Sequence, residues 1–106
     1  MATQRRELIW TLRARDALDE AAAYVAQDSP ETAVDLVERA LDAADSLDTL
    51  SERGHIVSEL DIPAVREIFV HKYRLVYEVA PSKITVIGFL HGAREFNRWW
   101  RGESPG

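Results

Sequence analysis

Two repeating patterns, one in each half of the chain, constrain its fold more than any other feature. Over residues 13–27 and 30–50, apolar residues recur every three or four positions, as on one face of a helix. Residues 64–71, 73–80 and 83–91 are instead rich in the branched and aromatic residues that favour strands. A helix pair followed by a run of strands is typical of an α+β fold and argues against alternating βαβ units.

Local signals set the expected boundaries of these elements. Thr11 offers a side-chain oxygen to cap the first helix. Ser29 suits the N-cap of the second helix and Pro30 its first position. We expect the second helix to run to about Leu50 and to stop near Gly54, where a positive φ is easily accommodated.

A short strand at residues 7–11 completes the predicted order, which is β-α-α-β-β-β. We expect a helical hairpin packed on a small, mainly antiparallel sheet, with residues 81 and 82 forming a tight turn between the last two strands. Residues 1–102 should form a single domain and residues 103–106 a flexible tail. The last strand is apolar on both faces, which predicts a central or doubly covered position.

Composition narrows the functional classes. The chain has no cysteine, which excludes disulfides, thiolate metal sites and a cysteine nucleophile. No apolar run approaches the roughly 20 residues that span a bilayer, so we expect a cytoplasmic protein and no membrane partner.

The net charge of −5 divides into −7 over residues 1–52 and +2 over residues 53–106. The acidic half is typical of solvated helix faces, and the basic half hints at an interaction surface. An acidic chain is a poor candidate for non-specific nucleic-acid binding, and we expect no sequence-specific DNA binding by this chain alone.

Known catalytic motifs are absent from the sequence. It has no glycine-rich phosphate loop, no nucleophile elbow and no paired histidines at metal-ligand spacing, so we expect neither a metal nor a cofactor. Four strand residues could nevertheless supply the base, the acid and the cation that RNA cleavage needs. These are Arg66, Arg74, Tyr77 and His91. Strand arginines are often structural, however, and ion pairs of Arg66 with Glu67 and of Arg74 with Glu78 are the alternative.

The C-terminal stretch combines cations with aromatic residues at helical spacing. Arg94, Arg98 and Arg101 would form one stripe, with an apolar stripe beside it. The apolar residues are Phe96, Trp99 and Trp100. These aromatic residues either pack back onto the sheet or form a protein-binding edge, since Trp and Arg are common at interface hot spots.

Several motifs together resemble the ParE-type toxins of the RelE/ParE superfamily, also called plasmid-stabilisation proteins. The most specific are Arg66-Glu67, the Tyr-Arg-x-x-Tyr pattern from Tyr73 to Tyr77, and the strand end His91-Gly92-Ala93-Arg94. Either strand motif alone would be weak, but the pair in this order is fairly specific.

The resemblance implies the toxin of a bacterial type II toxin–antitoxin system, neutralised by a cognate ParD-like antitoxin. ParE-type members are associated with inhibition of DNA gyrase by binding, whereas the RelE-type branch consists of ribosome-dependent mRNA endonucleases. The acidity of this chain and its His-Gly strand end favour the gyrase-directed branch, so we lean against an enzyme. If it were a nuclease, its catalytic residues would be the four strand residues given above.

On the gyrase-directed interpretation, a set of cationic and aromatic residues is the candidate for partner binding. They are Arg66, Arg74, Arg94, Arg98, Trp99, Trp100 and Arg101. We expect Arg66 and Arg74 to meet acidic antitoxin residues. The antitoxin segment itself should lie along the helical hairpin or the sheet edge.

Overall fold

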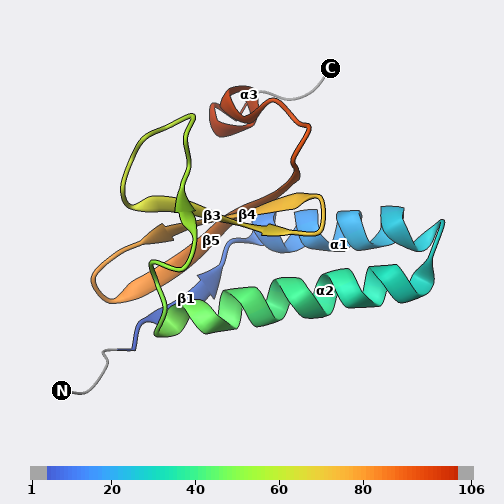
Figure 1. The fold of residues 1–106 in the computed structure, drawn as a ribbon, viewed down its shortest axis with the longest axis horizontal. Helices are drawn as coiled ribbons and strands as arrows, with labels where there is room; N and C mark the ends of the chain where they lie inside the picture. The colour runs from blue at the N-terminus through green and yellow to red at the C-terminus, as the bar shows by residue number, and fades with distance from the viewer. Residues whose placement is uncertain (1–4, 103–106) are drawn as a thin grey trace.

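The computed structural model describes residues 5–102, and the predicted flexible tail at residues 103–106 lies outside them. A helical hairpin crosses one face of a twisted five-stranded sheet, and a short C-terminal helix lies on the other (Figure 1). The helices are α1 (Leu12–Ala26), α2 (Pro30–Asp45) and α3 (Phe96–Trp100), with a 3-10 turn, η1, over Ser46–Asp48. The strands are β1 (Glu7–Trp10), β2 (His55–Ile56), β3 (Val65–Val70), β4 (Tyr73–Val79) and β5 (Lys83–His91). The predicted α+β class is confirmed.

The sheet has the strand order β1-β5-β4-β3-β2. Strands β2 to β5 pair antiparallel, whereas β1 pairs in parallel with β5, placing Trp10 opposite Val86. The mainly antiparallel sheet is therefore confirmed. Strand β2 was not predicted, since two residues are too few to produce a detectable alternation.

Both long helices begin where their caps predict. The Thr11 hydroxyl accepts a hydrogen bond from the Ala14 N–H at 3.1 Å. The Ser29 hydroxyl accepts one from the Thr32 N–H at 3.2 Å, with Pro30 in the first helical turn. Each such cap contributes about 1 kcal/mol.

The second helix ends earlier than predicted, at Asp45 instead of about Leu50. The Ser46 hydroxyl donates to the Ala43 carbonyl at 2.7 Å, and the chain tightens there into the 3-10 turn. The predicted reason for a glycine at residue 54 was also wrong, because Gly102 is the one glycine with positive φ within residues 5–102. A Cβ on Gly54 would lie 2.6 Å from the Glu67 carbonyl oxygen and 2.7 Å from the Tyr77 hydroxyl, so residue 54 is small because other atoms approach it closely.

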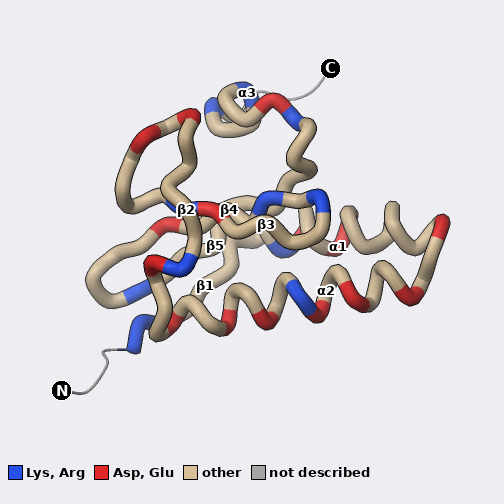
Figure 2. The backbone as a smooth tube through the Cα atoms, in the orientation of Figure 1, with Lys and Arg blue, Asp and Glu red and all other residues tan. Residues whose placement is uncertain are grey.

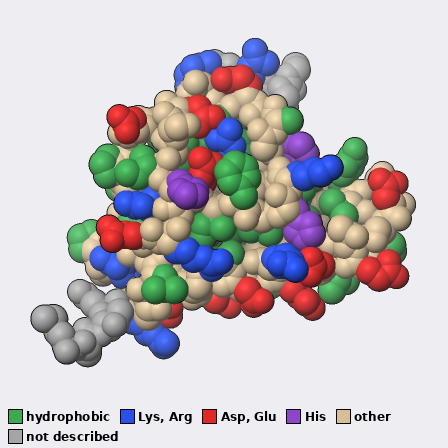
Figure 3. Space-filling model, viewed as in Figure 1, with side chains coloured by type: hydrophobic (Ala, Val, Ile, Leu, Met, Phe, Trp, Pro, Cys, Tyr) green, Lys and Arg blue, Asp and Glu red, His purple; other side chains and the backbone are tan. Residues whose placement is uncertain are grey.

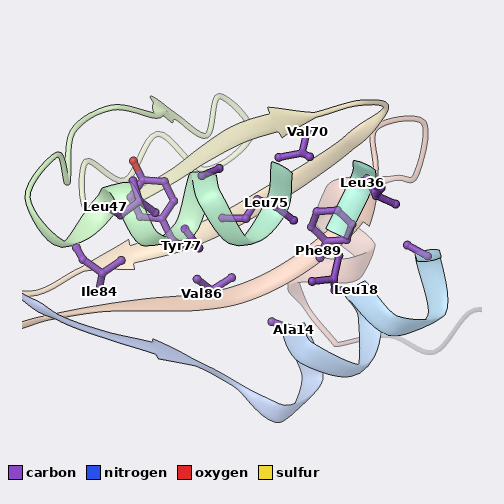
Figure 4. Close-up of a cluster of buried hydrophobic side chains, with 14 residues drawn as sticks. Ala14, Leu18, Leu36, Leu47, Val70, Leu75, Tyr77, Ile84, Val86 and Phe89 are labelled. Atoms are coloured by element: carbon purple, nitrogen blue, oxygen red, sulfur yellow. The ribbon is translucent and has the colours of Figure 1, made fainter. Parts of the chain in front are cut away.

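Two apolar clusters cover the two faces of the sheet. The larger one joins α1 and α2 to the sheet through residues such as Leu18, Leu36, Leu75 and Phe89 (Figure 4). The smaller cluster, on the opposite face, lies beneath α3 and consists of Val57, Val65, Val76, Leu90, Phe96 and Trp99. Strand β5 contributes to both clusters, which confirms its predicted doubly covered position.

Within residues 5–102, no helix is both long enough and apolar enough to cross a membrane.

Candidate functional site

Arg74 lies on the face of the sheet that α3 covers, and its guanidinium is already engaged. It binds the two carboxylate oxygens of Glu59 at 3.1 and 2.9 Å, in a fork-to-fork geometry. It also lies 3.5 Å from Glu67 and 5.2 Å from the centroid of the Phe96 ring. The side chain is 14% exposed, so Arg74 anchors the loop after β2 and the start of α3 to the sheet. The alternative pairing of Arg74 with Glu78 is wrong, because the Arg74 guanidinium binds the Glu59 carboxylate instead.

Glu67 is the buried carboxylate of this cluster. It is 6% exposed, and its Oε1 atom has no hydrogen-bond partner among the described residues. Burial raises the pKa of Glu67, and the positive charge of Arg74 opposes that rise. The predicted surface pair with Arg66 does not form, because side chains alternate along β3 and point the two residues to opposite faces.

Tyr77 lies on the other face of the sheet, beneath η1, and is fully buried. Its hydroxyl donates to the Ser51 carbonyl at 2.9 Å and accepts from the Gly54 N–H at 2.8 Å. Burial raises the pKa of the phenol, and the bond from Gly54 opposes that rise. Tyr77 therefore holds the segment between η1 and β2 against the sheet, and both bonds of its buried hydroxyl go to the backbone of that segment.

Arg66 stands opposite Tyr77 in the β3–β4 register. It donates to the Gly54 carbonyl at 2.9 Å and lies 3.9 Å from the exposed carboxylate of Glu52. Its side chain is 18% exposed. Arg66 thus reinforces the segment that Tyr77 holds.

His91 lies at the end of β5, far along the strands from Arg66 and Tyr77. It stands opposite Tyr73 in the β4–β5 register and contacts the Tyr73 ring edge-on at 5.3 Å. Its Nδ1 accepts a hydrogen bond from the Ala93 N–H at 3.0 Å. Tyr73 and Tyr77 are four residues apart on one strand, which is about 13 Å. His91 therefore lies near one end of the sheet and the pair of Arg66 and Tyr77 near the other.

His91 is one of the residues that line a cleft of about 450 Å³ between the β3–β4 turn and the end of the hairpin. Its lining includes Tyr24, His71, Lys72 and Tyr73. The His71 ring bonds Asp35 of α2 at 2.8 Å, and hydrogen bonds from Arg39 and His71 lower the pKa of Asp35. Sequence spacing gave no sign of this contact, which joins residues 36 positions apart.

The four predicted catalytic residues thus occupy three separate places. Arg74 is on the α3 side, Arg66 and Tyr77 are on the hairpin side beneath η1, and His91 is at the far end. They do not converge on a point where one phosphate could meet a base, an acid and a cation.

The C-terminal segment holds the remaining candidates. Phe96 and Trp99 are buried against the sheet, and Arg13 of α1 stacks on the Trp99 ring 4.9 Å from its centroid. Trp99 is therefore a core residue of the free chain. Trp100 is 37% exposed, and Arg94, Arg98 and Arg101 are also at the surface. Together these last four residues form the α3 edge.

Comparison with known proteins places this geometry in context. A family model described as the ParE toxin of the type II toxin–antitoxin system parDE matches residues 8–96. A solved structure described as a chromosomal ParDE TA system from P. aeruginosa aligns with a TM-score of 0.66 and 21% sequence identity, covering 83% of this chain and 97% of that chain. At that identity the likeness concerns the fold alone. No curated protein matches the chain. The family match ends at Phe96, the first residue of α3, so nearly all of that helix lies beyond it.

Proposed function

The chain belongs to the ParE toxin family of type II toxin–antitoxin systems, and on that premise we propose that it inhibits DNA gyrase by binding, breaking no bond itself. The observation that carries this proposal is the dispersal of Arg66, Arg74, Tyr77 and His91 over three places in the fold. Acid–base catalysis requires its groups within hydrogen-bond reach of one substrate.

Charge supports a protein target over an RNA target. RNA binding relies on cations that neutralise phosphates, and the chain carries a net charge of −5. Arg66 and Arg74, which would have to contact RNA, are largely buried and bound to groups of the same chain.

We assign target binding to the α3 edge, which consists of Arg94, Arg98, Trp100 and Arg101. An exposed Trp beside Arg side chains is typical of an interface hot spot. The edge stands on a rigid base, because Phe96 and Trp99 fix α3 to the sheet. We expect the protein to act in the cytoplasm, where gyrase works.

A cognate ParD-like antitoxin is the second proposed partner. A specific, stable pair of this kind buries about 1,200–2,000 Å². Arg66 and Arg74 already bind groups of their own chain, which argues against these two arginines as the main contacts for an acidic antitoxin segment.

The gyrase proposal is tested by a supercoiling assay with the purified chain. Wild type should inhibit supercoiling, whereas the double variant Arg98→Ala/Trp100→Ala should inhibit about tenfold less. Arg15→Ala, an exposed change on α1, is the matched control and should inhibit like wild type. Unchanged gyrase activity at a large excess of wild-type chain would refute the target.

The competing function, a ribosome-dependent endonuclease, is tested by primer extension on translated mRNA after induction. We expect no new 5′ ends within codons. Their appearance, and their loss in His91→Ala, would replace the binding proposal with a nuclease.

A further inference from the structure

The outer edge of β5 is covered by β1 over only part of its length. The parallel pairing of the two strands ends with Trp10 opposite Val86, and the Thr11 N–H then donates to the Val86 carbonyl at 3.0 Å. There the chain turns into α1, so the rest of this β5 edge has no neighbouring strand within residues 5–102. A cleft of about 460 Å³ lies at the uncovered edge, lined by residues from α1, from β5 and from the C-terminal segment.

Arg13, one of the residues that line this cleft, connects α1 with α3. Its Nη2 atom donates to the Trp99 carbonyl at 3.3 Å, and its guanidinium carbon lies 4.9 Å from the centroid of the Trp99 ring. The two residues are 86 positions apart in the sequence. The same indole lies against Gly88 of β5, where it fills the space of a side chain. Trp99 is therefore held by β5 and by Arg13 together.

Helix α3 depends on such contacts because it is short. It has five residues, far fewer than an isolated helix needs to be stable in water. Arg74 and Arg13 supply two of the contacts, one to the Phe96 ring and one to the Trp99 ring. Arg74 is largely buried and also binds Glu59, so a change there disturbs the core. Arg13 is exposed on α1, so its contact with α3 can be removed without leaving a buried charge unpaired.

The hydrogen bond from Arg13 falls at the end of α3 that carries the exposed indole. The Trp99 carbonyl belongs to the last turn, where a positive charge is favoured, and it also accepts a bond from the Gly102 N–H at 3.0 Å. The ring centroid of Trp100 lies 6.3 Å from that of Trp99 and 6.2 Å from that of Phe96. Arg13 thus fixes both the peptide unit that joins the two tryptophans and one of the rings beside Trp100.

The surface that this contact orients is basic, in a chain that is acidic overall. Figure 2 shows basic segments on α3, whereas α2 carries mainly acidic ones. In Figure 3, Lys and Arg side chains gather at the end of the molecule where α3 lies. Charged groups fix the register of an interface only when they are held in a defined arrangement. The binding strength of the α3 edge should therefore depend on how firmly α3 is attached.

We propose that Arg13 is a positioning residue for target binding: from α1 it holds Trp99 against β5 and so sets the orientation of the α3 edge. This inference rests on the proposed inhibition of gyrase and adds to it a residue that lies outside α3. The family match ends at Phe96, so the contact of Arg13 with Trp99 joins the matched part of the chain to the part beyond it. An edge that is already ordered loses less conformational entropy when it binds, which links affinity to a contact outside the interface.

The test measures inhibition of gyrase supercoiling by purified full-length variants. Arg13→Ala should require about five times more protein than wild type for half inhibition, because α3 loses its contact with α1. Arg13→Lys keeps a cation and a hydrogen-bond donor, and it should inhibit to within about twofold of wild type. Arg15→Ala removes an exposed arginine from another side of α1 and should inhibit like wild type.

Two further measurements separate positioning from a general loss of stability. Hydrogen exchange, followed by nuclear magnetic resonance, should be faster in Arg13→Ala at the Trp99 and Gly102 amides, which bond within α3 and at its end, and unchanged in β3 and β4. In the Arg98→Ala/Trp100→Ala background, which already lacks most of the α3 edge, Arg13→Ala should weaken inhibition by less than about twofold.

The outcomes separate this inference from the proposed function. Inhibition by Arg13→Ala equal to that of wild type would overturn the positioning role and leave gyrase as the target. A loss of the same size with and without the α3 edge would also overturn it, because Arg13 would then act independently of α3. Faster exchange throughout the sheet would overturn it by showing that the whole chain is destabilised. Supercoiling that wild type leaves unaffected would overturn the target itself, and this inference with it.

Discussion

The indole of Trp99 occupies the space in which a side chain at residue 88 would stand. A Cβ built on Gly88 would collide with Cζ2 and Cη2 of that ring. Gly88 faces α3 from the middle of β5, opposite Val76. The attachment of α3 to the sheet therefore depends on the absence of a side chain at one strand position.

Gly88→Ala should destabilise the protein by about 1–3 kcal/mol, because the added methyl group overpacks the contact and displaces Trp99. Urea denaturation followed by tryptophan fluorescence measures the effect. In a Trp99→Ala background the same change should cost far less, as a double-mutant cycle would report. An equal cost in both backgrounds would show that the ring is not what Gly88 accommodates.

Tyr77→Phe should cost about 1–3 kcal/mol of unfolding free energy, because it leaves the Ser51 carbonyl and the Gly54 N–H without their buried partner. Chemical denaturation measures the loss, with Tyr24→Phe, at a 69% exposed residue, as the control. Toxicity at a temperature where the variant is folded should persist. A folded, stable variant that loses toxicity would instead give the hydroxyl a role in activity.

Arg74→Ala should destabilise the chain by about 2 kcal/mol or more, because the Glu67 carboxylate would remain buried after losing the positive charge of Arg74 beside it. Arg74→Lys should recover part of the loss, since Lys keeps the charge but cannot bind both oxygens of Glu59. Thermal denaturation of the two variants beside Arg15→Ala provides the comparison. Equal melting temperatures for all three would contradict a structural role for the cluster.

The raised pKa of Glu67 predicts a specific pH dependence of stability. Compared with the unfolded chain, folding favours the protonated form of Glu67. The stability that this group contributes is therefore full below its ordinary pKa of 4.5, and it is lost as the pH rises through the higher pKa of the folded state. Glu67→Gln should therefore equal wild type in stability at acid pH and exceed it near pH 7. Melting temperatures of wild type and Glu67→Gln from pH 4 to pH 8 measure this divergence, with Glu78→Gln, at an exposed strand position, as the control variant.

Local chemistry made much of the fold predictable. The caps at Thr11 and Ser29 and the turn between β4 and β5 depend on residues within a few positions of each other. The apolar content of β5 likewise predicted its cover on both faces. By contrast, the two-residue β2 exists because it pairs with β3, a contact that no local pattern encodes.

The site could be predicted as a set of residues but not as an arrangement. Tyr77 and His91 were recognised by type, yet strand alternation and register place them at opposite ends of the sheet. Glu59 is 15 residues from Arg74 and no motif contains both, so its carboxylate contact with that guanidinium was invisible in the sequence.

The sequence by itself determined the class, the order of the long helices and strands and the family, because periodicity, caps and strand motifs act over short stretches of chain. Only the tertiary structure decided which arginines are largely buried, as Arg66 and Arg74 are, and which lie exposed at the surface. The reason is physical: exposure and partnership depend on groups that folding brings together from distant positions, such as Glu59 with Arg74 and Gly88 with Trp99.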